Sequence, residues 1–569
     1  MKVCVVGAGP SGLTTIKQLL DEGHEVVCFD KNADLGGIWY RHDGDADQMK
    51  AFDNLYLTVS MKLMVYSDFP HRGDRVFYTR AQYLDYLREY ARRFGLAGHI
   101  RYGSPVTDLK RTGSGWTVTV DNGGPAPHIE DFDAVAVCTG PFRTPNTAIP
   151  ELAGFTGEVV HSAQYRNNEP FRGKRVLVVG LAESGADIVR EIGDVASECT
   201  LAIRSRSFLL PRLSDGVRTT DHGTVRSHQH EMLRRATDVP LEYDTFWGRS
   251  RIAKGIFIGT SMLYGAATTA VAVLRHKLRG APEVTTETGL NPFQQPIEPT
   301  MLDLDTPATE ENIEYIRNWN RASHPDGSWT QKAIFSKNVT FVPHLVSGRI
   351  ALNDAGIASA DGTTVRFKDG QSADFDMVML CTGFTRDFTI GDLSIEDGNV
   401  RNLYKHFLHP DHAGTAAYIG LVRPFSGGIP ICAEMQARYF ARVLSGELSP
   451  PRDLGQRIER DRLWEEYWTS LSPTHTEAIP AQVLYLDSLA SEIGCLMPWW
   501  KMVLNPKLFI QLWFGAFNQS SYRLVGPHNL GQAAYDDLYS EPVANRRFVA
   551  WDMSVLALMP PSVHPEHLM

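Results

Sequence analysis

The order of apolar runs, glycine turns and amphipathic stretches is repeated in two parts of the chain. Residues 2–30 predict a β-branched strand, a glycine turn, a helix that stops at Gly23 and a second strand that ends in an acid. Residues 174–204 predict the same succession, with the strand KRVLVV, the turn GLAESG, a helix and a further strand. Since this order opens a doubly wound nucleotide-binding unit, we predict two such units.

Two further apolar strands end in a Thr-Gly pair, DAVAVCTG at 133–140 and DMVMLCTG at 376–383. The second unit starts after the first of these strands, and sheet-type sequence resumes near Val339, so we expect one unit to be inserted into the other. The predicted fold class is α/β, with two nested doubly wound (Rossmann-like) domains, a helical insertion and a helical C-terminal extension. The predicted domains are 1–165 with 333–450 for the first unit, 166–213 for the core of the second, 214–332 for an insertion that completes or covers the second unit and the substrate channel, and 451–569 for the extension.

Composition and charge restrict the function classes. The chain has 569 residues, which is too many for one hydrophobic core, and its 43% hydrophobic and 21% charged residues are typical of a soluble globular protein. A net charge of -10 argues against a nucleic-acid partner, which would require a basic face. The cysteines are scattered and never spaced as C-x-x-C, so we expect reduced thiols in a cytoplasmic enzyme, without a disulfide framework or a metal site.

One segment, 255–274, has the length and the lack of charge of a membrane span. It is rich in Gly, Ala and Thr, which makes its transfer into lipid weak, so we expect a buried or interfacial helix instead. We expect no signal peptide, because the first apolar stretch, Val3 to Val6, runs straight into a glycine turn, and no membrane anchor in LALMPPSVHPEHLM, because it contains prolines and charges. We therefore expect at most a peripheral membrane contact. The sequence does not determine whether the chain forms a homo-oligomer.

The first glycine turn has the features of a site for FAD or NAD. Gly7, Gly9 and Gly12 follow a strand and open a helix, so the backbone can approach a pyrophosphate and the helix N-terminus can stabilise it. Asp30 ends the next strand, where an acid accepts hydrogen bonds from an adenosine ribose and disfavours a 2′-phosphate. The pair Gly36-Gly37, followed by Ile38 and Trp39, would allow close approach to a flavin, although Gly-Gly alone is a weak signal.

The second glycine turn favours NADPH. It reads Gly180-x-Ala182-x-x-Gly185, in which alanine replaces the middle glycine and adds one methyl group beside the pyrophosphate. Arg204 ends the next strand and Arg206 follows closely, and a guanidinium there suits the 2′-phosphate of NADPH. The alternative is a solvated surface pair of arginines.

The segment Phe155-x-Gly157-x-x-x-His161-x-x-x-Tyr165 lies just before the second unit. It resembles the fingerprint of the flavin-containing monooxygenases, and Tyr165 favours their N/S-oxygenating branch because the related Baeyer–Villiger enzymes usually have Trp there. Other segments resemble that family in the same order: SGAD (184–187), FSKNVTF (335–341), LYKHFLHP (403–410), GLVRPFSGGIPICAEMQARY (420–439) and SYRLVGP (521–527).

The resemblance, together with the two turns, implies a set of cofactor residues. Those expected at FAD are Gly7, Gly9, Ser11, Gly12, Asp30, Lys31, Gly37, Ile38, Trp39, Thr139, Gly140 and Gln436. Those expected at NADPH are Gly180, Ser184, Gly185, Ala186, Asp187, Arg204 and Arg206. His161 is better interpreted as a structural joint between domains than as a base.

One departure from the family pattern concerns the oxygenation site. The family has an asparagine shortly before S-D-F-P, which here is Ser67 to Pro70, and this chain reads LYLTVSMKLMVYSDFP without it. Thr58 or Val59 aligns with the missing residue, and the hydroxyls of Thr58 and Ser60 are therefore the candidates for the catalytic position. The alternative is that other groups hold the oxygenated flavin, beside which this asparagine lies in the family.

The implied reaction uses NADPH and O2. NADPH reduces the flavin, O2 adds to give a C4a-hydroperoxyflavin, bound NADP⁺ excludes water, and a soft nucleophile (an amine, hydroxylamine or sulfide) takes one oxygen atom. The alternatives are Baeyer–Villiger oxidation of a ketone and, more distantly, a non-catalytic FAD-binding redox sensor. A disulfide reductase is rejected, because the chain lacks a redox cysteine pair.

Overall fold

The structure is a computed structural model of the chain and describes residues 1–41, 51–71, 77–212, 221, 224–226, 263, 274, 278, 309–323, 335–424, 427–469, 478–479 and 482–540. The segment 255–274 lies outside the described residues except at Leu263 and Leu274, and so does the chain from 541 onward. Within the described part, no helix has both the length and the apolar character needed to cross a membrane.

A parallel sheet forms the centre of the first nucleotide unit. Its order is β20-β7-β1-β2-β3. The strands are β1 (Lys2–Val6), β2 (Glu25–Phe29), β3 (Ile100–Arg101), β7 (Ala134–Val137) and β20 (Ala416–Tyr418). Because β1 is covered on both faces, it reads as a continuous apolar run: Val3 and Val5 enter one core, and Cys4 and Val6 enter the other.

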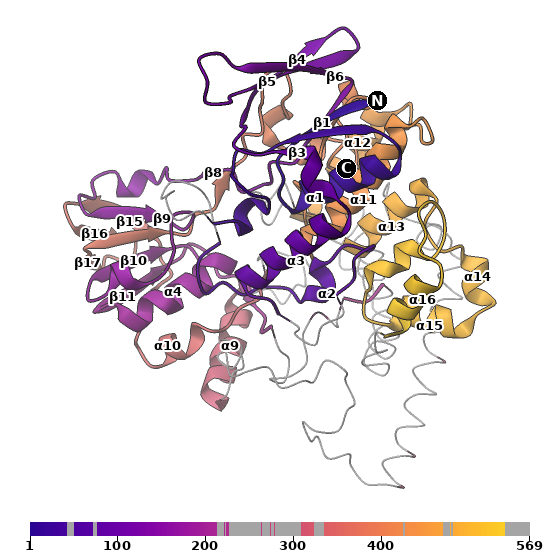
Figure 1. Cartoon of the computed structure of the whole chain (residues 1–569). Coiled ribbons are helices and arrows are strands. Elements are labelled where there is room, and N and C mark those ends of the chain that lie inside the picture. The colour runs from indigo at the N-terminus through magenta and orange to yellow at the C-terminus, as the bar shows by residue number, and fades with distance from the viewer. Residues whose placement is uncertain are drawn as a thin grey trace.

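Helices cover one face of this sheet and a small antiparallel sheet covers the other. The helices are α1 (Pro10–Asp21), α3 (Arg80–Arg93) and α11 (Ile429–Leu444), with the short α2 (Met61–Met64) beside them. The antiparallel strands are β4 (Val106–Thr112), β5 (Gly115–Val120) and β6 (His128–Phe132), which project at the top of Figure 1. Thr79 and Gln82 form a capping box that starts α3, which fixes this helix across the sheet.

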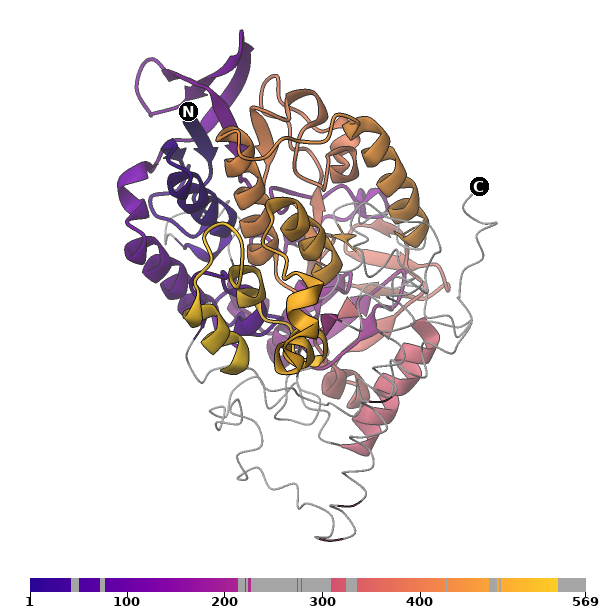
Figure 2. The same ribbon diagram turned by 90° about the vertical axis from the view of Figure 1, so that its right-hand side faces the viewer.

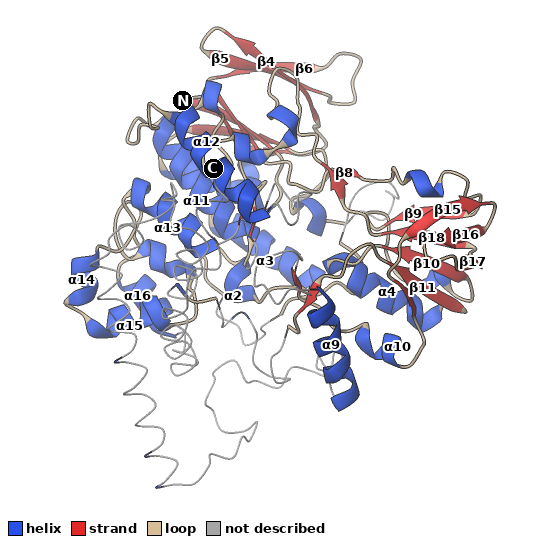
Figure 3. Ribbon diagram, turned by 180° about the vertical axis from the view of Figure 1, so that it is seen from behind, coloured by secondary structure: helices blue, strands red, loops and turns tan. Residues whose placement is uncertain are grey.

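The second nucleotide unit repeats this design. Its parallel sheet has the order β14-β11-β10-β18-β9. The strands are β9 (Glu158–His161), β10 (Arg175–Val179), β11 (Glu198–Ala202), β14 (Ala351–Asn353) and β18 (Met377–Leu380). One face packs against α4 (Glu183–Val195), α9 (Glu310–Ser323) and α10 (Val342–Val346), and the other packs against the antiparallel strands β15 (Ile357–Asp361), β16 (Thr364–Phe367) and β17 (Ser372–Asp374). Figure 3 shows the two units side by side, seen from behind.

The strand pairing corrects both segments of the first predicted unit. Residues 1–165 and 333–450 are expected to belong to it, but β9 pairs with β18, β18 pairs with β10 and β14 pairs with β11 in the second sheet. The chain returns to the first sheet only at β20. The physical reason is that both DAVAVCTG and DMVMLCTG are buried parallel strands, and a short apolar run does not specify which sheet it joins.

Short strand pairs connect these parts: β8 (Thr144–Pro145) with β19 (Phe384–Thr385), β12 (Phe208–Leu209) with β13 (Phe335–Ser336), and β21 (Arg423–Pro424) with β22 (Ala478–Ile479). The described part of the C-terminal extension contains α12 (Leu454–Thr469), α13 (Gln482–Ile493), α14 (Trp499–Val503), α15 (Pro506–Phe514) and α16 (Gln532–Ser540). Its helices cover the first unit in Figure 2.

The extension is part of the first core. Val483 and Leu489 of α13 are fully buried in the same apolar cluster as α1 and α11. The described residues 224–226 of the predicted insertion also lie against the extension, since Val225 bridges Ala516 and the amide of Phe517 donates to the Thr224 carbonyl at 2.8 Å. The insertion therefore contacts two parts of the molecule, because α9 packs on the second unit through the buried Trp319.

Candidate functional site

The first glycine turn is closed by contacts that exclude a side chain. Gly7 has a φ of +103°, and a Cβ there would lie 2.9 Å from the Cys138 carbonyl oxygen. A Cβ on Gly12 would lie 1.8 Å from the Gly7 carbonyl oxygen, which no L-residue could accommodate without opening the turn. Gly9 is extended, and a Cβ added to it would lie 3.5 Å from the Gly37 Cα. The turn therefore leaves backbone N–H groups at the start of α1 open to a phosphate.

The second turn has the same geometry. Gly180 has a φ of +97°, and its added Cβ would lie 2.7 Å from the Cys381 carbonyl oxygen. A Cβ on Gly185 would lie 2.6 Å from the Gly180 carbonyl oxygen. Ala182 has a φ of -137° and a ψ of -160°, an extended conformation that alanine adopts without strain. The backbone thus accepts the substitution that departs from the glycine motif.

The two Thr-Gly pairs occupy equivalent places beside the turns. Gly140 and Gly383 have φ angles of +75° and +77° where the chain leaves β7 and β18. Thr382 donates to the Asn146 carbonyl at 2.6 Å. The hydroxyl of Thr139 is buried, and no described residue serves as its hydrogen-bond partner. A buried, unsatisfied hydroxyl beside the first turn is a group that a bound cofactor would satisfy.

Asp30 connects the end of β2 to the first turn. It is buried, and its carboxylate accepts from the amides of Ala8 at 2.5 Å and Asn32 at 2.7 Å. Burial raises the pKa of Asp30, although these amides and Lys31 oppose the shift. Lys31 itself is exposed, and Ser11 is buried in the first turn of α1.

The loop after β2 returns to the glycine turn. A Cβ on Gly37 would lie 3.0 Å from the Gly9 Cα, so the two backbones touch. Gly37, Ile38 and Trp39 form a short 3-10 helix, and the Trp39 ring lies edge-on to Tyr83 with 4.7 Å between the ring centroids. These contacts bring the partly buried aromatic ring of Trp39 close to the first glycine turn.

Gln436 lies in the core under the first sheet. Its side chain is fully buried, accepts from the Gly420 amide at 2.9 Å and donates to the Tyr485 hydroxyl at 2.7 Å. A Cβ on Gly420 would collide with Ser11. Gln436 therefore fixes a backbone that touches the first turn.

The arginines after β11 have different environments. Arg206 forms an ion pair with Asp354 at 2.6 Å and lies over the Trp319 ring at 4.7 Å. Arg204 is exposed, and its side chain makes no hydrogen bond or ion pair with another described residue. Both lie just past the carboxyl end of β11, the edge where ligands of doubly wound sheets bind. Of these two arginines, Arg204 is the one that has no partner in the described part of the chain.

The first turns of α4 contain both open and occupied groups. Ser184 is exposed at the start of the helix, whereas Ala186 and Asp187 are fully buried. The Asp187 carboxylate accepts from Arg212 at 3.3 Å and from the Asn338 side chain at 2.5 Å. The Ser184 side chain is therefore accessible to a phosphate, whereas the Asp187 carboxylate is occupied by Arg212 and Asn338.

Glu183 is a residue that the sequence analysis missed. It is the first residue of α4, and one carboxylate oxygen accepts from the Lys337 amide at 2.9 Å. Its other oxygen is buried and has no hydrogen-bond partner in the described part of the chain. Burial raises the pKa of this carboxyl. An acid at a helix N-terminus that is expected to hold phosphate is the signal that could have identified it.

The segment of the missing asparagine is fixed by its backbone. The Leu57 amide donates to Tyr78, and the Ser60 amide donates to the Asp221 carboxylate at 2.5 Å. Thr58 is half-buried, and Ser60 is fully buried with a hydroxyl that has no partner among the described residues. The structure thus holds the short segment that contains Thr58 and Ser60 through its backbone amides.

His161 is satisfied by the backbone. The Ala163 amide donates to its Nδ1 at 3.1 Å, and its Nε2 lies 3.0 Å from the Gly383 carbonyl, which fixes a neutral tautomer. Burial lowers the pKa of His161, so the ring stays neutral at neutral pH. The geometry agrees with the expected structural joint, since the ring connects the end of β9 to the Thr-Gly turn after β18.

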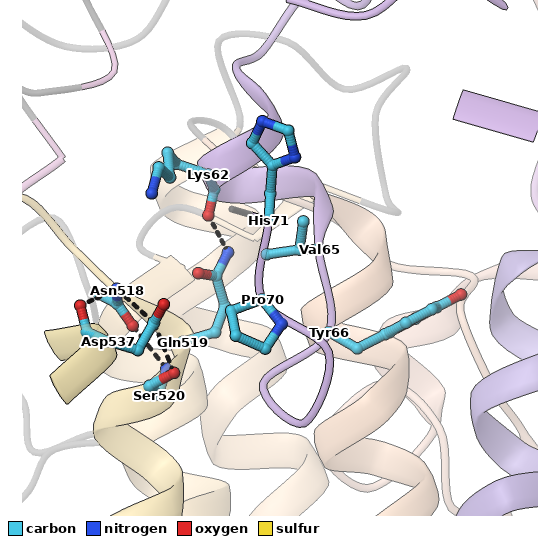
Figure 4. Close-up of a pocket in the computed structure, with 9 residues that line it drawn as sticks. All are labelled: Lys62, Val65, Tyr66, Pro70, His71, Asn518, Gln519, Ser520 and Asp537. Carbon is cyan, nitrogen blue, oxygen red and sulfur yellow. Dashed lines mark hydrogen bonds between the residues drawn. The ribbon is translucent and has the colours of Figure 1, made fainter. Parts of the chain in front are cut away.

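A small pocket lies elsewhere, between the α2 segment and the C-terminal extension (Figure 4). Gln519 donates to the Lys62 carbonyl, and Asp537 accepts from Asn518 at 2.9 Å and Ser520 at 2.7 Å. The hydrogen bond between Gln519 and Lys62 joins the α2 segment to the extension at this pocket.

These observations test the fit of the two cofactors. Each glycine turn is a cradle that a Cβ would fill, which fits the pyrophosphate of a dinucleotide. The Thr139 hydroxyl beside the first turn and the Arg204 guanidinium after β11 have no hydrogen-bond partner among the described residues. All seven cysteines are free, and the described residues contain no cluster of potential metal ligands. The fold and the site define a flavoprotein oxidoreductase with two dinucleotide sites.

The comparisons identify the family. The model described as FMO-like, flavin-binding monooxygenase-like, matches residues 1–242 and 322–537. The chain belongs to this family. It is an FAD- and NADPH-dependent monooxygenase, and the predicted family, fold class and cofactors are confirmed.

Several relatives cover almost the whole chain. The 4-hydroxybenzoate brominase (decarboxylating) of Marinomonas mediterranea is 31% identical over 548 residues, which cover 95% of this chain and 93% of the relative. Flavin-containing monooxygenase 2 of Homo sapiens is 27% identical and covers 92% of this chain and 89% of its own. The structure of S-allyl-L-cysteine S-oxygenase from Allium sativum has a TM-score of 0.55 at 21% identity, covering 89% of this chain and 92% of that one. At this identity the structure supports the fold alone.

Proposed function

We propose that this monooxygenase transfers one atom of O2 to a soft nucleophile, of which amines, hydroxylamines and sulfides are the leading class. NADPH supplies two electrons, the second oxygen atom leaves as water, and bound FAD supplies the O2 chemistry. The observation that carries the proposal is the pair of glycine turns with the same geometry, each ending beside a Thr-Gly turn.

The residues divide between the two cofactors in this proposal. Gly7, Gly9 and Gly12 would hold the FAD pyrophosphate, and Asp30 would face its ribose. Ser184 and the N-terminus of α4 would hold the NADPH pyrophosphate. Arg204 would bind the 2′-phosphate, since its guanidinium is exposed and has no ion pair with a described residue.

The segment with Thr58 and Ser60 would face the reacting oxygen. The support is that the Ser60 hydroxyl is buried without a partner in the described part of the chain, so a bound ligand could satisfy it. A polar group that excludes bulk water from this place would prevent the loss of oxygen as hydrogen peroxide.

A second candidate is bromide as the nucleophile. Two curated relatives named 4-hydroxybenzoate brominase (decarboxylating) are each 31% identical over 95% of this chain, against 28% for an N-oxide-forming monooxygenase of Mus musculus. Bromide is also a soft nucleophile, so the same oxygen transfer would yield hypobromite, which can replace a carboxyl group on a phenol by bromine with release of CO2.

The test is product analysis with the purified, FAD-loaded enzyme. NADPH oxidation is followed with a tertiary amine, a thioether, bromide with 4-hydroxybenzoate, and a cyclic ketone, and the products are identified by mass spectrometry under ¹⁸O2. We expect an N-oxide or sulfoxide that contains one ¹⁸O atom. Brominated phenol with CO2 release alone would support the second candidate instead. An ester formed from the ketone alone would contradict both.

A further inference from the structure

Two buried bridges connect the nucleotide-binding helix α4 of the second unit to the segment 57–60 of the first. The first bridge is Arg212, which is 1% exposed. It donates to the Asp187 carboxylate of α4 at 3.3 Å and to the Leu57 carbonyl at 3.3 Å. One guanidinium thus contacts both units.

The second bridge passes through Lys337. Its backbone amide donates to Glu183 at the first residue of α4, and its ammonium forms an ion pair with Asp221. Asp221 in turn accepts from the Ser60 amide at 2.5 Å. Lys337 is 9% exposed and Asp221 is 5% exposed, so this path is shielded from water.

A gain in folding stability does not explain why these charged side chains are buried. Desolvation of a buried ion pair offsets most of its Coulomb attraction, so such pairs are weak evidence for a stability gain. They fix one arrangement of the groups they join, because a displaced partner would leave a buried charge unpaired. Here the arrangement that is fixed is the position of segment 57–60 relative to α4.

We propose that Lys337 and Arg212 are positioning residues that hold the segment with Thr58 and Ser60 against the nucleotide-binding helix, so that occupancy of the nucleotide site keeps the oxygenation site closed to water. The inference rests on the proposed function, since Thr58 and Ser60 are assigned to the oxygenation site there. Neither positioning residue needs to touch the reacting atoms.

The second bridge depends on pH. Burial, which Glu183 opposes and the nearby Arg212 reinforces, lowers the pKa of Lys337 to about 7. Asp221 pairs with the ammonium, and Asp187 and Arg423 are the other charges that act on Glu183. The ammonium form exists below the shifted pKa and is lost as the pH rises through it, so the contact with Asp221 weakens on the alkaline side.

The first test compares Lys337→Met with Lys110→Met, a control at an exposed position of β4. Hydrogen–deuterium exchange is measured on peptides that cover residues 57–60, with and without NADP⁺. Loss of the held acceptor of the Ser60 amide is expected to speed exchange about tenfold in Lys337→Met, and to remove the extra protection that NADP⁺ gives. The control is expected to behave as wild type.

The second measurement is the amount of hydrogen peroxide formed per NADPH oxidised. Lys337→Met is expected to raise it severalfold while FAD content and the rate of flavin reduction stay within about twofold of wild type. In wild type this amount should rise between about pH 6 and about pH 8. Lys337→Arg keeps its charge, so its profile should be flat, whereas Glu183→Gln should keep the slope but move it to lower pH, because Glu183 raises the pKa of Lys337.

Unchanged exchange at residues 57–60 in a folded, FAD-loaded Lys337→Met enzyme would overturn the proposal. So would a pH profile that persists in Lys337→Arg. If the wild type oxygenates none of the tested nucleophiles but the exchange changes as expected, the proposed function fails and the positioning role stands, because exchange requires no turnover. If Lys337→Met does not fold, Lys337→Arg and Arg212→Lys decide the question by the same exchange measurement.

Discussion

At the scale of single residues, the two turns differ in which positions tolerate a side chain. The third glycine of each turn faces the carbonyl of the first: a Cβ added to Gly12 would lie 1.8 Å from the Gly7 oxygen, and one added to Gly185 would lie 2.6 Å from the Gly180 oxygen. The middle position is extended, and alanine occupies it in the second turn. A side chain at the third position must therefore open the turn. A side chain at the middle position leaves the turn intact and only crowds a ligand that approaches it.

Gly12→Ala is expected to abolish FAD binding, because its Cβ would displace the Gly7 carbonyl and distort the start of α1. The flavin-to-protein absorbance ratio of the purified variant measures this. Gly98→Ala is the matched control, since no atom lies within 4 Å of its added Cβ. Normal flavin content in Gly12→Ala would show that the turn can relax.

Arg204→Met is expected to raise the KM for NADPH about 10- to 100-fold, because a charge-assisted contact with phosphate contributes about 1.5–3 kcal/mol. The KM for NADH should stay unchanged, since NADH lacks the 2′-phosphate. Steady-state kinetics with both nucleotides measures the difference, and Arg366→Met, at an exposed position of β16, is the control. An equal loss for both nucleotides would indicate that Arg204 acts on the fold.

At the scale of elements, a buried charge network joins the S-D-F-P segment to α11 and to the short helix Gln519–Arg523. Arg523 is fully buried and contacts Ser67 at 2.7 Å, Asp68 at 3.0 Å and Glu434 at 2.7 Å. Lys17 of α1 also pairs with Asp68 at 2.7 Å. Sequence segments of the family that lie far apart in the chain, S-D-F-P and SYRLVGP, are thus parts of one network.

Arg523→Met is expected to lower the free energy of unfolding by about 3–5 kcal/mol, because it removes the buried cation beside Glu434 and leaves Asp68 paired with Lys17 alone. Urea denaturation followed by tryptophan fluorescence measures the change. Arg88→Met is the control: its ion pair with Asp34 is at the surface, with a side chain 47% exposed, so its removal should cost less than about 1 kcal/mol. Similar losses for the two variants would argue against the network.

At the scale of the whole molecule, the two units share core residues. Phe52 belongs to the sequence of the first unit but is buried in the core of the second, 5.6 Å from the Tyr165 ring. The Tyr165 hydroxyl donates to Glu191 at 2.6 Å, and the Asp53 amide donates to the Arg166 carbonyl at 2.9 Å. The last residue of the fingerprint therefore fixes the unit that follows it against the one that precedes it.

Phe52→Ala is expected to lower the free energy of unfolding by about 3–5 kcal/mol through the cavity that it leaves between the units. Chemical denaturation measures the loss, and NADP⁺ binding should weaken along with it. Ile129→Ala is the control, because Ile129 is 61% exposed and its truncation should change stability by less than about 0.5 kcal/mol. A cost below about 1 kcal/mol for Phe52→Ala would show that this contact does not hold the units together.

The sequence by itself determined the two glycine turns, the acid after β2, the arginines after β11 and the family, because each is a local strand–turn–helix pattern or a short motif. Only the tertiary structure decided that β14 and β18 join the second sheet, and that Glu183 and Lys337 meet near the start of α4. A buried parallel strand has the same apolar sequence in either sheet, and a hydrogen bond between residues far apart in the chain leaves no periodic signal. Local pattern fixes the elements, whereas their partners depend on packing across the whole chain.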